Sequence, residues 1–335
     1  MIRHRALAGA TVGLLAAVLG LPGAALAGPR GTDTRLCAIH PLPLPTGVAL
    51  GRAQAVDPTG RFVAGIGSRV VDGVWEQVLL LWRGGRVTAV DTALAEQVVG
   101  VNASGVVVGN AFITARPQPW RYQDGRPTDL VVPGSVSGAW VTGINGRGDI
   151  VGFGAVEATE NAIVLRWPAD RPGAVEVVDV LPDATATAVL DDGTILGYGR
   201  ESLGASSYVG WMLRPDGRLT LLTMPGRRSA YVSAARGGWA VGGAGDDGEE
   251  GFAPVRWDLR TGATTMLDPT AGSVEGVTPD GVVLGSWAVW RDGRLTPLPS
   301  ADDVSSLGSE AIADNGTVVG WTNTGRLTPA RWTGC

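Results

Sequence analysis

Residues 143–154 read GINGRGDIVGFG, and three motifs overlap in this short stretch. It has the closely spaced glycines of a phosphate-binding loop, the adhesion tripeptide Arg147-Gly148-Asp149, and the pattern of two strands joined by a tight turn. In a dinucleotide-binding fold such glycines lie between a strand and a helix, but no helical period follows Gly154. The rest of the chain decides between the three interpretations.

The stretch is one of seven copies of a repeat, in which a turn glycine is followed by a β-rich run and a second glycine. The second glycines recur 35 to 45 residues apart and are Gly65, Gly109, Gly152, Gly197, Gly242, Gly285 and Gly320. Because glycines recur in every copy, we interpret those of residues 143–154 as turn and strand glycines. The Arg-Gly-Asp tripeptide occurs once, and we interpret it as part of the turn.

Each copy has a second half, in which an apolar run ends in tryptophan and a glycine-containing turn usually leads into another β-rich run. The seven tryptophans in register are Trp82, Trp120, Trp167, Trp211, Trp257, Trp290 and Trp332. Four-stranded antiparallel units that repeat in this way are typical of β-propellers, whose stacked sheets cover each other's faces. The sequence therefore predicts an all-β fold, a single seven-bladed β-propeller of four-stranded blades. The tryptophans are predicted to pack between blades, with sugar binding as the alternative.

Acidic and amide side chains precede the turns between the first and second strands of most copies. Their oxygen atoms can accept hydrogen bonds from the backbone of the turn, and we expect them to start these turns. They are Asp57, Asn102, Asn145, Asp191, Asp280 and Asp314.

The two ends of the chain predict how the ring closes. Copy seven ends shortly after Trp332 without a fourth strand, whereas residues 35–43 (RLCAIHPLP) resemble the fourth strand at residues 294–299 (RLTPLP). We therefore expect the N-terminal segment to complete the last blade. Cys37 and Cys335, the only two cysteines, are predicted to form a disulfide there, with two free thiols as the alternative. The loop-entropy expression gives such a crosslink roughly 5–6 kcal/mol as an upper figure.

Copy six is the shortest of the seven. Trp290 lies only five positions after the second glycine of this copy, which allows no more than a minimal hairpin. We expect this blade to be irregular or to lack a strand.

The pattern Ile-Asn-x-x-Gly-x-Val-Val-Gly followed by Trp-x-x-Gly resembles the bacterial extracellular HAF-repeat family over roughly residues 35–335. The His-Ala-Phe triplet that names the family is absent, and its places read Val-Leu-Leu-Leu before Trp82 or Ala-Pro-Val-Arg before Trp257. The resemblance implies a secreted, propeller-like repeat protein. It brings no established activity and no catalytic residues.

The first 27 residues have the pattern of a secretory signal peptide. A basic start with Arg3 and Arg5 precedes a short apolar run, and Ala25-Leu26-Ala27 forms a cleavage pattern before Gly28. We expect cleavage after Ala27, export to the extracellular space without membrane insertion, and a propeller domain over residues 28–335. Disulfides persist in such an oxidising compartment.

Charge and composition exclude several functions. Loss of the two signal-peptide arginines moves the formal net charge from −5 to −7, whereas nucleic-acid binding needs concentrated positive charge. No nucleic-acid partner is therefore expected. The sequence contains no lysine, which excludes Schiff-base chemistry on lysine. His40 is the one histidine of the predicted mature chain, and we interpret it as structural.

Binding is predicted on the face that carries the loops between the second and third strands. The interval from second glycine to tryptophan varies from 5 to 17 residues, and variable loops on a rigid scaffold commonly carry binding sites. The candidate residues there are Asp72, Trp75, Glu76, Glu157, Glu160, Glu201, Tyr208, Asp246, Asp247, Glu249 and Glu250. The last four share one loop, which either binds Ca²⁺ or is a solvated acidic loop; its spacing matches no known calcium loop.

Two functions fit the sequence. The first is a secreted, monomeric, non-catalytic binding or scaffold propeller without a cofactor, whose ligand is a cell-wall component, a glycan or a protein. The alternative is a propeller-type hydrolase or lyase that acts on an extracellular polymer with paired carboxylates. No spacing in the sequence forces two carboxylates together.

Overall fold

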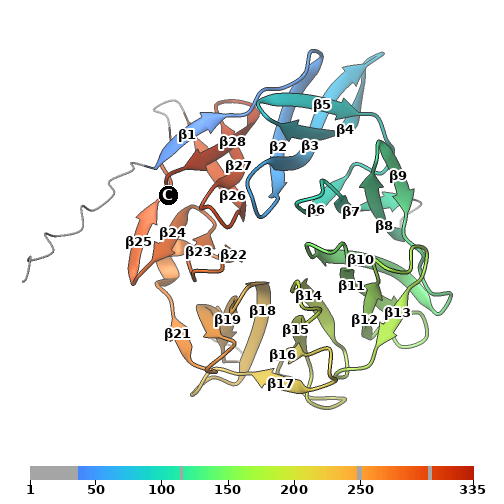
Figure 1. Ribbon diagram of the computed structural model, residues 1–335, viewed down its shortest axis with the longest axis vertical. Helices are drawn as coiled ribbons and strands as arrows, with labels where there is room; N and C mark the ends of the chain where they lie inside the picture. The colour runs from blue at the N-terminus through green and yellow to red at the C-terminus, as the bar shows by residue number, and fades with distance from the viewer. Residues whose placement is uncertain (1–36, 114–115, 247–250, 301–303) are drawn as a thin grey trace, which may run out of the picture. The chain divides into compact units, whose positions relative to one another are not determined.

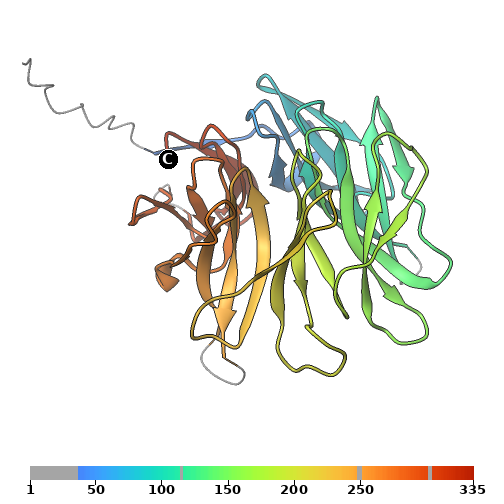
Figure 2. The same cartoon turned by 60° about the horizontal axis from the view of Figure 1, so that its bottom comes forward.

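The computed structural model describes residues 37–113, 116–246, 251–300 and 304–335. These residues form seven four-stranded antiparallel sheets arranged as blades around a central axis (Figure 1; Figure 2). The predicted seven-bladed β-propeller is therefore confirmed. The predicted signal peptide, residues 1–27, lies outside the described residues. Within these ranges, no helix is both long and apolar enough to cross a membrane.

The four strands of each blade are called a to d from the axis outward. Strands a, in blade order, are β2 (Val48–Val56), β6 (Gln97–Val101), β10 (Val136–Ile144), β14 (Thr185–Val189), β18 (Ser229–Arg236), β22 (Val274–Val277) and β26 (Ser306–Ile312). Strands b are β3 (Phe62–Val71), β7 (Val107–Ile113), β11 (Ile150–Val156), β15 (Ile195–Gly199), β19 (Trp239–Gly245), β23 (Val283–Gly285) and β27 (Val318–Asn323).

The outer half of each blade is built in the same way. Strands c are β4 (Val74–Arg83), β8 (Arg116–Gln123), β12 (Ala162–Trp167), β16 (Val209–Leu213), β20 (Ala253–Asp258), β24 (Ala288–Arg291) and β28 (Leu327–Thr333). Strands d are β5 (Arg86–Val90), β9 (Arg126–Asp129), β13 (Glu176–Val178), β17 (Leu219–Leu222), β21 (Thr264–Met266), β25 (Arg294–Pro297) and β1 (Ala38–Pro41). A 3-10 helix, Pro269–Ala271, precedes β22. Because the strands alternate in direction, the a–b and c–d turns share one face and the b–c and d–a connections share the other.

The tryptophan of each strand c packs between neighbouring blades. All seven are at most 8% exposed, so the prediction that they belong to the core is confirmed. Four indole N–H groups, at Trp82, Trp167, Trp257 and Trp332, donate over 2.7 to 2.9 Å to carbonyls that follow strand d of the preceding blade. These tryptophans therefore join blades by a hydrogen bond as well as by burial.

A β-bulge in each strand a lies beside the second glycine of the repeat. In blade three the pairing passes from Val141–Gly152 to Gly143–Val151 and leaves Thr142 without a partner. The carbonyl oxygen of Trp140 lies 1.8 Å from the place that a Cβ on Gly152 would occupy. The same approach, at 1.9 to 2.0 Å, recurs at Gly65, Gly109, Gly197, Gly242 and Gly320. No side chain fits there, which is why the repeat requires glycine.

The N-terminal strand closes the ring, as predicted. β1 pairs with β28 in the sheet of the last blade, with Ala38 opposite Thr333 and Pro41 opposite Ala330. The predicted disulfide joins Cys37 to Cys335 with an S–S distance of 2.06 Å, across 298 residues of sequence. First and last strands are thus paired by backbone hydrogen bonds and linked covalently.

The sixth blade is complete, so the expectation of a missing strand is wrong. It contains β22 to β25, and its strand b, β23, has only three residues. The short interval between Gly285 and Trp290 still accommodates a hairpin, because only Ser286 and Trp287 connect β23 to β24.

The predicted turn-starting side chains are confirmed in the first three blades. Asp57, Asn102 and Asn145 each accept backbone N–H bonds from within their own turns. The prediction is wrong for Asp191, since Leu190 occupies the first turn position and Asp192 accepts the N–H of Thr194. The prediction is also wrong for Asp280, because Thr278 accepts the N–H of Val282 in the sixth turn. It is wrong for Asp314 as well, because Asn315 accepts the N–H of Thr317 in the seventh turn.

Candidate functional site

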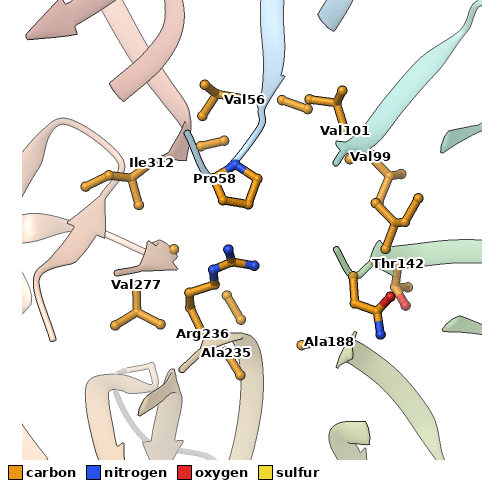
Figure 3. A pocket seen from close by; sticks show the side chains of 18 of the residues that line it. Val56, Pro58, Val99, Val101, Thr142, Ala188, Ala235, Arg236, Val277 and Ile312 are labelled. Carbon is orange, nitrogen blue, oxygen red and sulfur yellow. The ribbon is translucent and has the colours of Figure 1, made fainter. Parts of the chain in front are cut away.

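A cavity of about 250 Å³ lies on the axis of the propeller, lined by strands a from all seven blades (Figure 3). A β-bulge redirects the extra residue out of the regular ladder, and the free edges of strands a face the axis. All seven bulge residues line the cavity. They are Gln54, Val99, Thr142, Thr187, Ser233, Glu275 and Glu310.

Three neutral bulge side chains form hydrogen bonds with the next blade. The Gln54 side-chain oxygen accepts the N–H of Val98 (3.2 Å), Thr142 Oγ1 donates to the Ala186 carbonyl (2.8 Å), and Ser233 Oγ donates to the Val274 carbonyl (3.1 Å). The principal role of these side chains is therefore to hold neighbouring blades together.

The bulge residues of blades six and seven are glutamates, and their side chains form hydrogen bonds within their own blades. Glu275 accepts a hydrogen bond from Ser286 Oγ (3.2 Å), and Glu310 accepts one from the Trp321 indole (3.1 Å), in each case within its own blade. Within the described ranges, neither carboxylate forms an ion pair. Both carboxylates line the cavity and so keep acceptor capacity for a bound group.

The protein around the cavity raises the pKa of both glutamates. Burial is the main cause at Glu275, and the hydrogen bond from Ser286 offsets part of it. Burial also raises the pKa of Glu310; Arg52 and Trp321 oppose this effect, and the charge of Glu275 adds to it. At both sites burial therefore outweighs the groups that favour the charged form.

An ion pair crosses the opposite end of the cavity. Arg236, at the end of β18, points toward the axis (Figure 3) and binds Asp314 of the seventh blade. The two contacts are Nε–Oδ1 at 2.9 Å and Nη2–Oδ2 at 3.0 Å. Both residues belong to the a–b end of the propeller, so this pair narrows the channel there.

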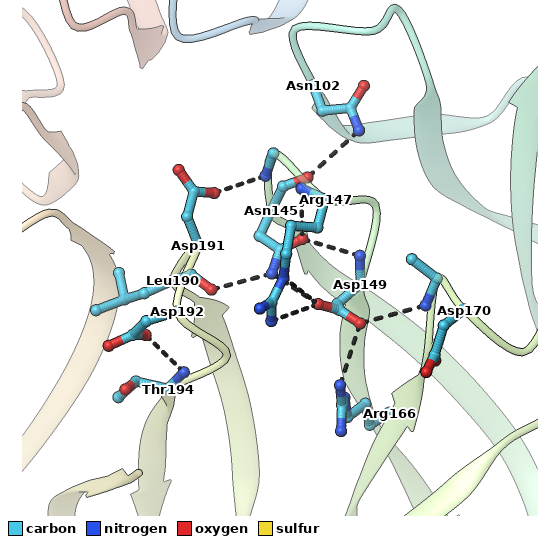
Figure 4. Close-up of polar contacts among 12 residues, drawn as sticks. Asn102, Asn145, Arg147, Asp149, Arg166, Asp170, Leu190, Asp191, Asp192 and Thr194 are labelled. Carbon is cyan, nitrogen blue, oxygen red and sulfur yellow. Dashed lines mark hydrogen bonds and ion pairs between the residues drawn. The ribbon is translucent and has the colours of Figure 1, made fainter. Parts of the chain in front are cut away.

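The Arg147-Gly148-Asp149 tripeptide is part of the protein's internal structure (Figure 4). Asp149 is only 4% exposed, and its carboxylate accepts bonds from the side chains of Asn145, Arg147 and Arg166 and from the N–H of Ala169. Burial opposes the charge, but these hydrogen bonds outweigh it and lower the pKa of Asp149 to about 2. The interpretation as a turn is confirmed.

The structure places the candidate residues predicted on the b–c face on several blades. Asp72, Trp75 and Glu76 belong to the long β3–β4 hairpin, where Trp75 is 58% exposed and Glu76 pairs with Arg69 at 3.2 Å. Glu157 and Glu160 are exposed in the β11–β12 connection of blade three. These two groups lie on different hairpins and do not form one site with each other.

Three other candidates gather between blades four and five. Glu201 and Tyr208 line a cleft of about 340 Å³, together with Arg227 and Arg228. Asp246 binds the guanidinium of Arg227 (3.0 Å) and accepts the N–H of Arg228 (3.0 Å). We call this feature the Tyr208 cleft.

The predicted calcium loop is only partly described. Asp247, Glu249 and Glu250 lie outside the described residues, and Asp246 is engaged by Arg227. Among the described residues, no group of three or more His, Cys, Asp or Glu side chains is arranged to hold a metal ion. Calcium binding stays a prediction.

Exposed apolar side chains mark the b–c face. Eight of the thirteen large exposed hydrophobic residues of the described chain lie in or beside b–c connections: Val70, Val71, Val74, Trp75, Phe112, Leu203, Phe252 and Trp287. The other five lie on or directly after outer strands d, and none lies in an a–b turn.

Comparison with solved structures finds other β-propellers. The propeller domain of the Trilobed protease from Pyrococcus furiosus aligns with 86% of this chain and 97% of its own, at 12% identity and a TM-score of 0.55. An acylaminoacyl peptidase in complex with Z-Gly-Gly-Phe-chloromethyl ketone aligns with 85% of this chain and 51% of its own, at 12% identity and a TM-score of 0.55. A puromycin-hydrolyzing peptidase of Mycobacterium tuberculosis aligns with 82% and 49%, at 15% identity and a TM-score of 0.50.

The likeness is one of fold. The chain spans about half the length of the two peptidases. The Pyrococcus furiosus domain is described as having an open velcro topology, whereas β1 pairs with β28 here. A scan against protein-family models and a search of curated proteins each find no match.

Sequence reasoning missed Glu275 and Glu310. A signal was present, because each bulge residue lies 9 to 11 positions before the second glycine of its copy. Aligned at this position, the copies read Gln, Val, Thr, Thr, Ser, Glu and Glu. Without knowledge of the bulge, however, nothing indicates that this position faces the axis.

Proposed function

We propose that this protein is a secreted, monomeric binding propeller that presents its b–c face to an extracellular ligand. The observation that carries the proposal is the concentration of exposed apolar side chains on that face. Trp75 is 58% exposed, Phe252 48% and Trp287 47%, and they project from three different blades. Exposed apolar groups rimmed by polar residues are common at binding surfaces.

The Tyr208 cleft supports the same face. Arg200 lies over the Tyr208 ring, 4.6 Å from its centroid, and donates to the hydroxyl at 3.0 Å. Asp183 binds the Nε of Arg200 at 2.9 Å. A tyrosine held in this way loses little conformational freedom on binding, which favours recognition.

The test is cosedimentation of the mature protein with insoluble cell-wall material, together with a thermal-shift screen against soluble wall fragments and oligosaccharides. The variant Trp75→Ser/Trp287→Ser is expected to lose binding. The matched control is Leu219→Ser/Leu221→Ser, which removes two exposed apolar residues from the outer strand β17. Equal binding by both variants would remove the b–c face from the proposal.

Export and oligomeric state are tested separately. The N-terminal residue of protein recovered from culture medium is expected to be Gly28. Light scattering is expected to give a monomer mass. An N-terminus at Met1, or a concentration-dependent dimer, would contradict these parts of the proposal.

One observation favours the second candidate function, a hydrolase or lyase. Glu275 and Glu310 line one cavity from adjacent blades, and burial raises the pKa of each, which suits a general acid. Turnover of a polymer that Glu310→Gln abolishes, with folding intact, would support the enzyme. Binding without turnover would support the binding propeller.

A further inference from the structure

We propose that the axial cavity binds an alkylammonium or guanidinium group between Glu275 and Glu310, which enters from the b–c face. This inference rests on the proposed binding function and names the ligand chemistry for the centre of that face. It covers both a small free amine and the basic side chain of a partner protein.

The two glutamates differ from three of the four neutral polar bulge residues; the fourth, Thr187, donates to the Leu196 carbonyl of its own blade. Gln54, Thr142 and Ser233 each bond to the neighbouring blade and so hold the ring together. Among the described residues, the side chain of Glu275 bonds to Ser286 and that of Glu310 to Trp321, each within its own blade. A carboxylate offers about four acceptor positions, so most of theirs stay available in the cavity.

The electrostatics of the cavity favour a cation. The two carboxylates occupy equivalent positions on adjacent blades; Glu275 is exposed to the channel and Glu310 is half-buried. Among the described residues neither has a basic partner in ion-pair contact, so a positive charge bound between them would be attracted by both. Arg52 lowers the pKa of Glu310 but forms no ion pair with it.

The chemistry of the cavity favours an organic cation over a metal ion. Calcium takes six to eight oxygen ligands, and the described residues supply no cluster of three ligating side chains. Aromatic rings lie beside the carboxylates instead. Trp321 donates to Glu310, and the charge of Glu275 acts on Tyr231, whose ring is 6.1 Å from that of Tyr198. These rings are not among the residues that line the cavity, so they act on the carboxylates rather than on the bound group.

The geometry also sets the direction of entry and the size of the ligand. Ser286 and Trp321 follow the second glycines of their blades, on the b–c side of the bulges, whereas the Arg236–Asp314 pair narrows the a–b end. The cavity of about 250 Å³ is smaller than the roughly 300–1,000 Å³ of pockets for drug-sized molecules. It therefore suits a single amine or side chain rather than a polymer segment.

The experiment is titration calorimetry of the mature protein with four probes. They are hexylamine, N-acetyl-lysine amide, N-acetyl-arginine amide and the uncharged isostere N-acetyl-norleucine amide. Wild type is expected to bind at least one cationic probe and not the isostere. In Glu275→Gln/Glu310→Gln, affinity is expected to fall about 10- to 100-fold, the usual loss for charge-assisted hydrogen bonds.

A matched control removes the same charge elsewhere. Asp129→Asn/Asp170→Asn neutralises two exposed carboxylates away from the axis and is expected to bind like wild type. Circular dichroism and thermal unfolding of both double variants establish that each is folded. Affinity in wild type is also expected to weaken as pH falls, because protonation removes the negative charge of the two glutamates.

The outcomes separate the inference from the function on which it rests. Binding of both hexylamine and an amino-acid amide indicates that free amines are ligands, and binding of an amide alone indicates a basic side chain of a partner. No cationic binding in wild type, or equal affinity in Glu275→Gln/Glu310→Gln, overturns the inference. If the cation site is overturned but a ligand is found whose binding requires Trp75 and Trp287, the proposed binding function still stands.

Discussion

Arg236 and Asp314 form a two-point ion pair, Nε to Oδ1 at 2.9 Å and Nη2 to Oδ2 at 3.0 Å, although 78 residues separate them in sequence. They belong to blades five and seven, and blade six lies between these blades in the ring. The backbone N–H of Asp314 also donates to the Pro58 carbonyl of blade one (2.9 Å). This aspartate therefore connects three blades at the a–b end of the channel.

The first prediction concerns the energy of this pair. A double-mutant cycle with Arg236→Ala and Asp314→Ala should give a coupling of about 1 kcal/mol in urea unfolding, because both side chains are partly exposed. The control cycle uses Arg260 and Asp258, neighbours in sequence whose arginine is largely exposed, and should give less. Equal coupling energies in the two cycles would mean that linking blades five and seven adds no stability beyond that of a local ion pair.

The second prediction tests the role of the repeat glycine. Gly152→Ala places a methyl group where the Trp140 carbonyl oxygen lies 1.8 Å away, so the strands must separate locally. We expect a loss of about 3 kcal/mol or more in unfolding free energy. Gly134→Ala is the matched control, since no atom lies within 4 Å of its added Cβ. A comparable loss in both would show that the close approach is unimportant.

The third prediction concerns ring closure. Cys37→Ser removes the crosslink between the ends of β1 and β28 and should cost about 2–5 kcal/mol in denaturant unfolding. Cys335→Ser should have the same effect, because each change breaks the same bond. Dithiothreitol should bring wild type to the stability of the variants and leave the variants unchanged. A difference between the two variants would point to a separate role for one thiol.

The fourth prediction is a pH dependence that originates at Asp149. Its pKa of about 2 lies below the ordinary 3.8, so it stabilises the fold fully above about pH 4 and loses this effect as pH falls toward 2. The integrated effect is about 2 kcal/mol. The stability gap between wild type and Asp149→Asn should therefore shrink between pH 5 and pH 2. The exposed Asp170→Asn should show no such change, and a constant gap at Asp149 would contradict the assignment.

The fifth prediction has the opposite sign and concerns the channel glutamates. Their raised pKa means that the folded state holds protons that the unfolded state has released, so stability falls as pH rises above about 4.5. Glu275→Gln/Glu310→Gln should accordingly have a higher melting temperature than wild type at pH 8. The difference should become smaller as pH falls toward 4, because protonation removes the charge of both side chains. A lower melting temperature at pH 8 would indicate that the carboxylates are compensated within the fold.

Much of the fold was predictable because a propeller repeats its local chemistry. The turn glycines, the second glycines and the strand c tryptophans recur in every copy, and each reports a local requirement for a turn, a close approach or a buried wedge. The closing strand was predictable for the same reason, since residues 35–43 carry the pattern of a strand d. The pairing of Cys37 with Cys335 follows from that closure.

The candidate site was predictable only in part. Glu201, Tyr208 and Asp246 were chosen from the variable b–c loops, and the structure gathers them around the Tyr208 cleft. That a ligand binds there stays a prediction. The prediction for Asp191 was wrong because the sequence does not show whether an aspartate side chain accepts a hydrogen bond from its own turn or from a neighbouring blade. Asp191 in fact accepts the N–H of Gly146 in blade three, at 2.7 Å.

The sequence by itself determined the number of blades, the strand order and the way the ring closes, because these depend on residue types repeated at fixed intervals. Only the tertiary structure decided which side chains meet at the axis. A bulge shifts the side-chain alternation by one residue, and its position depends on how strands a and b pair rather than on the composition of either strand. Glu275 and Glu310 lie 35 residues apart in sequence, and that shared register brings them to one cavity.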